Sequence, residues 1–447
     1  MSNYATPGVY VEENSVLAPS IVQVSTAIPV FLGFTAKGPL GKALRISSLK
    51  EYEENFGGGV EHEFTVTTAI LNGVTVYSAV PPATGTPFFF FEAIRLYFMN
   101  GGGACYIISV GDNTAATSID KTDFIGGTVS GVTKENHIKT IEKLDEPTLI
   151  VFPEASNLAI GDYGDVANAA LTVAFNTKDK FVLIDPQDGA DFTDANSGTL
   201  TSFRVAITQY LEFGAAYFPF LETTVKYQIK SSSIVAPIGS EAYNKSLTAI
   251  NSVNGVIIPP SSLMAGVYAR VDRENGVWKA PANLALQGVV KPVTAISDAN
   301  QALLNVDADT GKSVNALREF SGKGTVVWGA RTLDGNSNEW RYINVRRLFI
   351  TVEESVKKAT SQFVFENNDA KTWVKINSMI TAYLNGLWKE GGLTGSAPEE
   401  AYFVEVGLGT TMTQDDILNG KMIVRIGLAA VRPAEFIILE FSHFINQ

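Results

Sequence analysis

The chain is poor in the residues that most catalytic and metal sites use. Its 447 residues include one cysteine, Cys105, and three histidines, His62, His137 and His443. A single cysteine excludes an internal disulfide framework and is typical of a reducing cytoplasm. No histidine lies between residues 138 and 442, so that long region lacks the imidazole base of a serine hydrolase. The composition therefore argues against an enzyme of this class.

Sequence motifs for phosphate, dinucleotides and metals are missing too. Gly311-Lys312-Ser313 resembles the end of a P-loop, but Val306 stands where the first glycine of that motif is required. The glycine triplets at 57–59 and 101–103 lack the dinucleotide spacing and are expected to end helices. No histidine and cysteine cluster has zinc-ligand spacing. We therefore expect no cofactor, no bound metal and no enzymatic activity.

Two single residues that could carry chemistry have simpler interpretations. Asp185 ends an apolar stretch, as acidic residues of α/β active sites often do, but Pro186 follows it and favours an Asx turn. Cys105 stands beside Tyr106 and two isoleucines, which favours a core residue over a nucleophile.

Charge is also scarce and of one prevailing sign. Only 18% of the residues are charged, 45% are hydrophobic, and the formal net charge is -12. No region concentrates lysine and arginine enough to hold phosphate, which argues against nucleic acid as a partner. Neither a signal peptide nor an apolar run of membrane length is present, so we expect folding in the cytoplasm and no membrane insertion. So little charge indicates a surface buried against other subunits, or an ordinary large core.

What the sequence does contain, up to about residue 335, is an alternation of strands and helices. Such alternation predicts an α/β layer. The expected strands are 28–35, 105–110, 148–152 and 180–185, and the expected helices are 47–56, 88–99, 165–176 and 203–212. Between them, residues 111–140 are polar and weakly patterned, and we expect a loop-rich surface excursion.

Two consecutive amphipathic helices follow, at 345–363 and 370–388, because apolar residues recur there at spacings of three and four. Asn344 is expected to cap the first, and the turn at 366–369 to cap the second. Arg346 and Arg347 stand in the first turn, where the helix dipole disfavours cations, so we expect acidic partners elsewhere. The second helix has no acidic residue, and one stripe carries Lys371, Lys375 and Lys389. A solvated face remains the simpler interpretation of that stripe.

Both ends of the sequence have strand patterns without an adjacent hairpin partner. The residues concerned are Val9, Tyr10, Val11 and Glu12 near the start, and Phe436, Ile437, Ile438 and Leu439 near the end. Such strands must pair with a distant segment of the same chain or with a neighbour's sheet. We expect them to be donated between subunits.

Taken in order, short motifs along most of the chain resemble the contractile tail sheath proteins of phages, R-type bacteriocins and extracellular injection particles. They are TPGVYVEE (6–13), TAIPVFLGFT (26–35), YFMNGGG (97–103), PPSS (259–262), AGVYARVD (265–272), GVWKAPAN (276–283), VWGART (327–332), WRYINVRR (340–347), residues 363–373, and RPAEF (432–436). Each motif alone is weak, whereas the ordered set is specific. Residues 111–140 match nothing in the family.

The resemblance implies a multidomain α/β and α+β fold. It would consist of an N-terminal arm (1–22), an N-terminal domain (23–140), a subtilisin-like α/β layer without catalytic residues (141–335), and a C-terminal α+β sheath domain with an extension (336–447). It also implies a structural subunit that stacks as hexameric rings around an inner tube and contracts from a metastable extended state. The alternatives are another tube or shell protein of a phage-like particle, or an α/β hydrolase.

The resemblance further implies partners and a place of action. The partners would be other copies of the chain, the inner tube protein, and baseplate and terminator or cap proteins, with sheath paralogues as a further possibility. Family sheaths grip the tube through a helix of the C-terminal domain, and we hypothesise that Lys371, Lys375 and Lys389 form that grip. Assembly would take place in the bacterial cytoplasm, with the product part of a phage tail or of a released extracellular particle.

Overall fold

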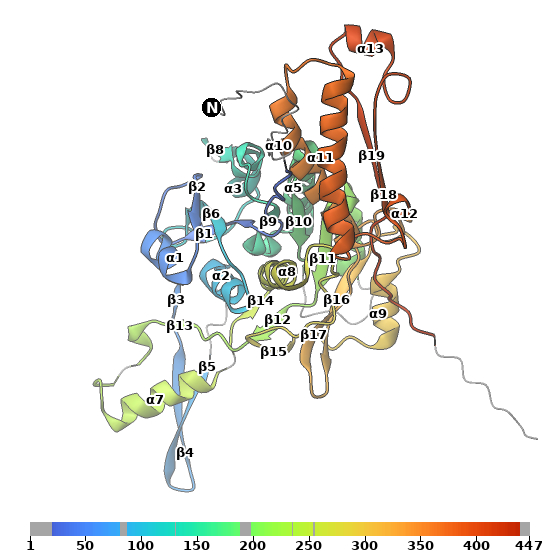
Figure 1. Ribbon diagram of the computed structural model, residues 1–447. Coiled ribbons are helices and arrows are strands. Elements are labelled where there is room, and N and C mark those ends of the chain that lie inside the picture. Colours follow the sequence, from blue (N-terminus) through green and yellow to red (C-terminus); the bar gives the residue numbers. More distant parts are fainter. Residues whose placement is uncertain are drawn as a thin grey trace, which may run out of the picture. The chain divides into compact units, whose positions relative to one another are not determined.

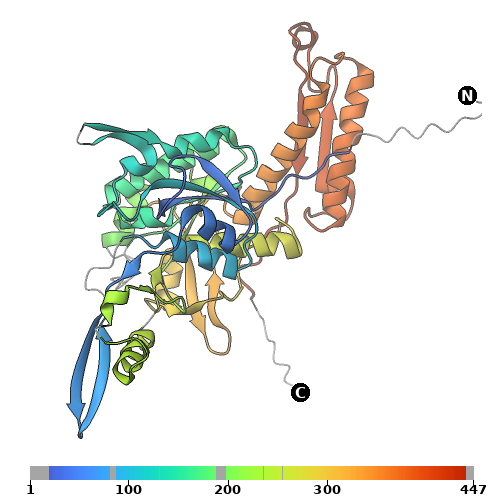
Figure 2. The same ribbon diagram turned by 90° about the vertical axis from the view of Figure 1, so that its left-hand side faces the viewer.

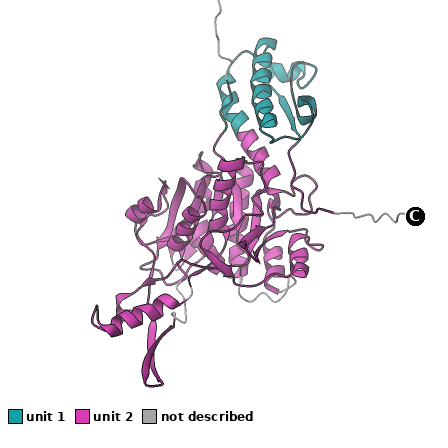
Figure 3. Ribbon diagram, turned by 60° about the horizontal axis from the view of Figure 1, so that its bottom comes forward, with its two compact units in different colours: residues 1–23, 355–429 teal, residues 24–354, 430–447 magenta. Residues whose placement is uncertain are grey.

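The computed structural model of the chain describes residues 20–80, 87–129, 131–187, 198–234, 236–253 and 255–438. These residues form two compact units (Figure 3). The larger unit contains residues 24–354 and 430–438, and the smaller unit contains 20–23 and 355–429. Within the described ranges, no helix has both the length and the apolar character needed to cross a membrane.

An eight-stranded sheet forms the centre of the larger unit (Figure 1), in the order β17-β16-β11-β10-β9-β1-β6-β2. The strands from β16 to β6 run parallel, and the two edge strands are antiparallel to their neighbours. The bounds are β1 Pro29–Thr35, β2 Ala43–Ile46, β6 Cys105–Asp112, β9 Leu149–Val151, β10 Phe181–Ile184, β11 Gly214–Phe218, β16 Val314–Phe320 and β17 Gly324–Trp328.

Helices bury the central strands on both faces, as parallel sheets require. Helix α8 (Ser261–Asn275) packs on β9, β10 and α2 (Phe90–Met99), while α5 (Ile160–Thr177) packs on β10 and α6 (Gly198–Ala206). Every residue of β1, β9, β10 and β11 is buried, which explains why these strands are continuous apolar runs in the sequence. The predicted α/β layer is confirmed.

The structure joins residues 23–140 and 141–335 instead of separating them, because β1 and β6 share the sheet with β9 to β17. The prediction of a loop-rich excursion at 111–140 was wrong in part. The described residues there include α3 (Thr122–Ile125), α4 (His137–Thr140) and a hairpin of β7 (Gly126–Val129) and β8 (Val132–Asn136). Short, half-exposed elements of this kind bury too few residues to show a period in the sequence.

A second hairpin, β4 (Thr65–Leu71) and β5 (Val74–Val80), projects from the larger unit beside α7 (Glu241–Ser252), as Figures 1 and 2 show. This hairpin was not predicted from the sequence. The other α-helices and strands described before α10 are α1 (Leu49–Phe56), β3 (Glu61–His62), β12 (Leu221–Thr223), β13 (Gln228–Ile229), β14 (Ile257–Ile258), β15 (Val289–Pro292) and α9 (Asp298–Asn305).

Helix α10 (Ile343–Thr360) was predicted correctly, but its first turn differs from expectation. Asn344 lies inside the helix and donates from Nδ2 to the carbonyl oxygens of Trp278 and Val431, so it is not a cap. Arg347 has the expected acidic partner: its Nη1 and Nη2 lie 2.9 and 2.5 Å from the two carboxylate oxygens of Asp272. Arg346 stacks its guanidinium 4.1 and 4.5 Å from the ring centroids of Phe213 and Trp340. Burial lowers its pKa, and the nearby carboxylates of Glu353, Glu212 and Glu339 oppose that shift, so it too has acidic neighbours.

The smaller unit contains α11 (Ala370–Lys389), α12 (Pro398–Ala401), α13 (Gln414–Leu418) and a two-stranded sheet of β18 (Tyr402–Val406) and β19 (Val424–Leu428). The second predicted helix is therefore confirmed.

The Arg347–Asp272 pair yields a prediction about stability. Its side chains are only 3% and 4% exposed, so Asp272→Asn leaves a buried guanidinium without a counter-charge, which typically costs about 3–5 kcal/mol. The matched control is Glu405→Gln, because Glu405 pairs with Arg425 at an exposed site where a loss of about 0–1 kcal/mol is typical. Urea unfolding of both variants measures the difference, and equal losses would contradict the assigned role.

Candidate assembly surfaces

The first candidate surface lies on α11, whose position is fixed by a capped start and a buried apolar face. The Asp369 side chain accepts the backbone N–H of Thr372 at 3.0 Å, and Asn368 Oδ1 accepts the indole N–H of Trp373 at 2.7 Å. The predicted capping turn is thus confirmed. The face that packs inward consists of buried residues at helical spacing, namely Thr372, Ile376, Met379, Ile380, Leu384 and Leu387.

The opposite face of α11 carries the lysine stripe. Lys371, Lys375 and Lys389 are all exposed, and none forms a salt bridge with another residue in the described part of the chain. Lys371 and Lys375 lie one turn apart. Lys389 lies on the same stripe but about 21 Å further along the axis, from a rise of ~1.5 Å per residue. The stripe is therefore a line of cations along the helix, available to an acidic surface.

The second candidate surface is the edge of the β18–β19 sheet. Ala429 N–H donates to the Ala401 carbonyl at 2.9 Å, and the register continues to Val406 opposite Val424. Hydrogen-bonded and non-hydrogen-bonded pairs alternate in an antiparallel ladder, so the backbone N–H and carbonyl groups of Gly427 and Arg425 also point toward β18. The backbone groups of the residues between them, Val424, Ile426 and Leu428, therefore point away from β18.

The two outer edges of this sheet are not equivalent. On β18, the side chain of Asn377 from α11 donates to the outward carbonyl of Val404 at 2.9 Å. On β19, the outward groups of Val424, Ile426 and Leu428 have no hydrogen-bond partner among the described residues. The open edge that can receive a further strand is therefore that of β19.

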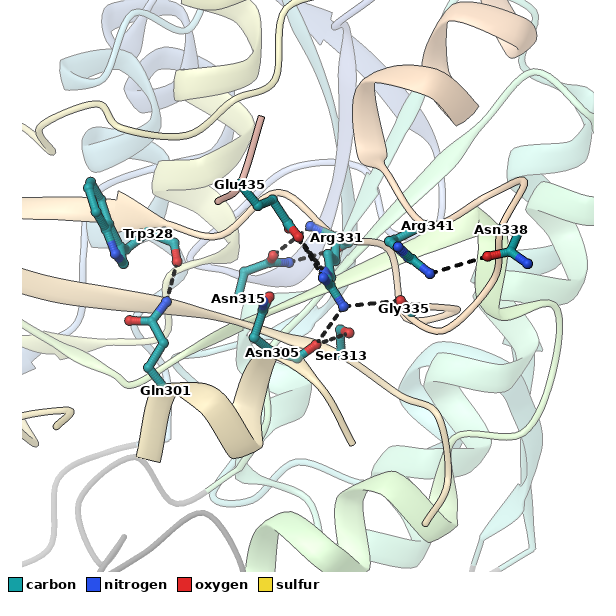
Figure 4. Close-up of polar contacts among 10 residues, drawn as sticks. All are labelled: Gln301, Asn305, Ser313, Asn315, Trp328, Arg331, Gly335, Asn338, Arg341 and Glu435. Atoms are coloured by element: carbon teal, nitrogen blue, oxygen red, sulfur yellow. Dashed lines mark hydrogen bonds and ion pairs between the residues drawn. The ribbon is translucent and has the colours of Figure 1, made fainter. Parts of the chain in front are cut away.

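The third candidate surface is the segment that leads to the C-terminus. Arg331 and Glu435 form a bidentate ion pair, with Nε to Oε1 at 2.9 Å and Nη2 to Oε2 at 2.5 Å (Figure 4). Their side chains are 5% and 15% exposed. Arg331 Nη1 also donates to the carbonyl oxygens of Asn305 and Gly335, and Asn315 holds the Arg331 backbone at both its N–H and its carbonyl.

This ion pair fixes the point from which the predicted C-terminal strand departs. Beyond Glu435, the side chains of Phe436, Ile437 and Ile438 are 73%, 80% and 82% exposed, and these residues form no strand with any described part of the chain. Leu439 and the predicted N-terminal donors, Val9, Tyr10, Val11 and Glu12, lie outside the described residues.

The residues that carry this anchor were not predicted. Arg331 and Glu435 both stand in motifs of the family resemblance, VWGART and RPAEF, but single opposite charges far apart in a sequence give no sign of their pairing. Asn344, taken for a helix cap, instead holds the Val431 carbonyl on the same segment.

Asp185, which the sequence offered as a possible catalytic residue, has a structural role. Its side chain accepts the backbone N–H of Ser261 at 2.8 Å, at the start of α8, and its own N–H donates to the Tyr163 hydroxyl. The predicted Asx turn was therefore wrong, because the carboxylate reaches across to a helix start. Burial raises the pKa of Asp185 to about 7. His62 and His137 are both buried, and His443 lies outside the described residues.

Comparison with known proteins supports an assembly role. Residues 336–443 match the model of the phage tail sheath C-terminal domain. The chain is 33% identical to the sheath of an extracellular contractile injection system, PVC, in its contracted state, covering 99% of this chain and 98% of that one with a TM-score of 0.67. It is also 33% identical to the contracted helical sheath of the anti-feeding prophage, covering 98% and 99% of the two chains with a TM-score of 0.68.

Curated relatives are matched over smaller parts. The tail sheath protein of Enterobacteria phage T4 is 24% identical over 47% of this chain and 30% of its own length. That of Vibrio phage KVP40 is 31% identical over 30% of this chain and 20% of its own length. The alignments thus cover less than a third of these two relatives.

The anchor generates a prediction about the C-terminal segment. Glu435→Gln keeps the size of the side chain and removes its charge, so the segment should detach from Arg331. A nitroxide label on Ile437→Cys reports the change, because the native Cys105 is buried. We expect the electron paramagnetic resonance spectrum to show increased mobility. Asp298→Asn, which removes the charge of an exposed partner of Arg318, is the control and should leave the spectrum unchanged. An unchanged spectrum in Glu435→Gln would mean that the ion pair does not hold the segment.

Proposed function

Since the chain belongs to the contractile tail sheath proteins, we propose that it stacks as hexameric rings around an inner tube and is assembled in an extended, metastable state. Contraction then drives the tube through a target envelope. The energy comes from new contacts between subunits, so the subunit needs no catalytic site. The carboxylate of Asp185, which is occupied by the start of α8, supports a layer of the subtilisin type that has only a structural role.

The observation that carries this proposal is the open edge of β19 together with the anchored, exposed segment after Glu435. A two-stranded sheet is marginal without further strands, and an exposed apolar edge is an aggregation hazard unless it is paired. We propose that Phe436, Ile437, Ile438 and Leu439 of one subunit, and Val9, Tyr10, Val11 and Glu12 of another, add strands to the sheet of a neighbour. Main-chain hydrogen bonds then link the subunits.

The lysine stripe supplies the contact with the tube. In this proposal Lys371, Lys375 and Lys389 face an acidic tube surface, each with an exposed interaction of about 0–1 kcal/mol. Weak contacts of this kind, repeated over a whole particle, hold the register and still allow release. The further partners are the baseplate and the terminator or cap proteins, and the place of assembly is the bacterial cytoplasm.

Strand donation predicts that the termini are needed for the polymer and not for the monomer. Removal of residues 1–16, or of the residues after Phe436, should give folded monomers that do not polymerise. The second truncation retains Glu435 and therefore the ion pair with Arg331. Sedimentation and negative-stain electron microscopy measure the outcome, and tubes of normal length from either truncation would count against donation.

The acceptor side of the same prediction can be tested with one residue. Ile426→Pro removes an outward N–H that has no partner among the described residues, and edge strands tolerate proline on that side. The monomer should keep its circular dichroism spectrum but lose polymerisation. Gly427→Pro removes an inward group of the β18–β19 ladder and should instead damage the smaller unit itself.

The tube contact predicts a selective effect of charge reversal. Lys371→Glu, Lys375→Glu and Lys389→Glu together should leave sheath polymerisation intact and reduce the fraction of sheaths that contain a tube when both proteins are coexpressed. A triple reversal with the same charge change at three other exposed lysines, Lys42, Lys139 and Lys323, is the control. Electron microscopy gives the filled fraction, and equal filling in both triple variants would rule out this grip.

A further inference from the structure

The β4–β5 hairpin is an unusual surface for a protein of this charge. The two strands pair from Thr65 opposite Val80 to Leu71 opposite Val74. Asn72 and Gly73 form the turn, both with positive φ, of 53° and 77°. Between Glu63 and Glu92 the sequence contains no charged residue. Natural sheet edges are protected by charges, by proline or by a cover, and the strands of this hairpin have neither charge nor proline.

One face of the hairpin is partly covered within the chain, although Ile70, which lies on this face, is 77% exposed. Val66, Tyr77 and Ala79 are its half-buried positions, and they lie on the same face because Val66 pairs with Ala79 and Thr68 pairs with Tyr77. Helix α7 packs against both strands. The helix adds no net charge, since its ionised residues, Glu241 and Lys245, pair with each other at 2.7 Å.

The opposite face is exposed and uncharged, with Thr67 and Ser78 among its residues. It carries four large aliphatic side chains with high exposure: Leu71 61%, Val74 60%, Val76 41% and Val80 54%. The hairpin projects away from the eight-stranded sheet (Figure 2). We call these four residues the hairpin face.

We propose that the hairpin face binds a second copy of this chain, as a contact between subunits of the polymer separate from the donated strands. Copies that each carry a net charge of -12 repel one another, and screening is incomplete where surfaces touch, since the Debye length is about 8 Å in physiological salt. Copies therefore approach most easily through surfaces without charge. The hairpin and α7 together form such a surface, and its exposed aliphatic groups gain from burial.

The contact is between unlike surfaces. A sheath with a baseplate at one end has a direction, and subunits in a directional helical polymer meet head to tail through two different patches. The hairpin face of one copy therefore binds another part of its neighbour and not the neighbour's hairpin. This inference depends on the proposed polymerisation, but not on strand donation or on the tube contact.

The test introduces charge into the hairpin face. Val74→Lys with Val76→Lys should lower the yield of polymer at least tenfold, because both side chains would be desolvated in the contact. Val74→Thr with Val76→Thr keeps the shape and strand propensity without charge and should lower it less than threefold. Both residues are exposed in the monomer, so the melting temperature of the monomer should change little in either variant. A lysine pair that polymerises like the wild type would overturn the inference.

A labelling experiment separates a neighbouring copy from an external partner. Val76→Cys is the only accessible thiol in its variant within the described residues, since Cys105 is buried. A maleimide reagent should modify it at once in the monomer and at least tenfold more slowly in the polymer. Equal labelling in monomer and polymer would overturn the contact and indicate a partner outside the sheath. A wild-type chain that never polymerises, even with its tube and baseplate proteins, would overturn the proposed function as well.

Discussion

The rest of the larger unit depends on a buried ion pair at the start of α10, which links this helix to α8 and to the segment before β1. Arg347 joins α10 to α8 through Asp272 and also donates to the carbonyl of Thr26, just before β1 enters the sheet. Both charges are almost fully withdrawn from water, so each is tolerated only because the other is present. One side chain therefore fixes a helix, its neighbour and the entry to the central strand.

Much of this arrangement could be predicted from the sequence because it depends on local patterns. Apolar runs identified the central strands, and spacings of three and four identified α10 and α11. Arg347 signalled a distant acidic partner because a cation is unfavourable in a first helical turn. Arg346 gave the same signal, and it has acidic neighbours in Glu353, Glu212 and Glu339. Its contacts with the rings of Phe213 and Trp340 could not be predicted from the helix dipole.

What could not be predicted depends on contacts between distant residues. Asp185 holds the start of α8 across 76 positions of sequence, and Arg331 meets Glu435 across 104. The β4–β5 hairpin is a different case, because its Asn72-Gly73 turn between β-branched runs is a strong local signal of a hairpin, so it was predictable from the sequence although it was not predicted. The lysine stripe was placed correctly on an exposed helix face, whereas the open edge of β19 became visible only with the register of the sheet.

The position of the Arg331–Glu435 pair has a mechanical consequence. The predicted donor strand begins at Phe436, the residue directly after the anchor. If this strand is donated, no flexible linker separates it from the body of its own subunit. A displacement of the larger unit would then pull on the neighbour's sheet without first straightening a loose linker. In a polymer linked by such strands, neighbouring subunits would move together. The flexibility needed for a change of sheath diameter would then have to lie in the acceptor subunit and not in the C-terminal connection.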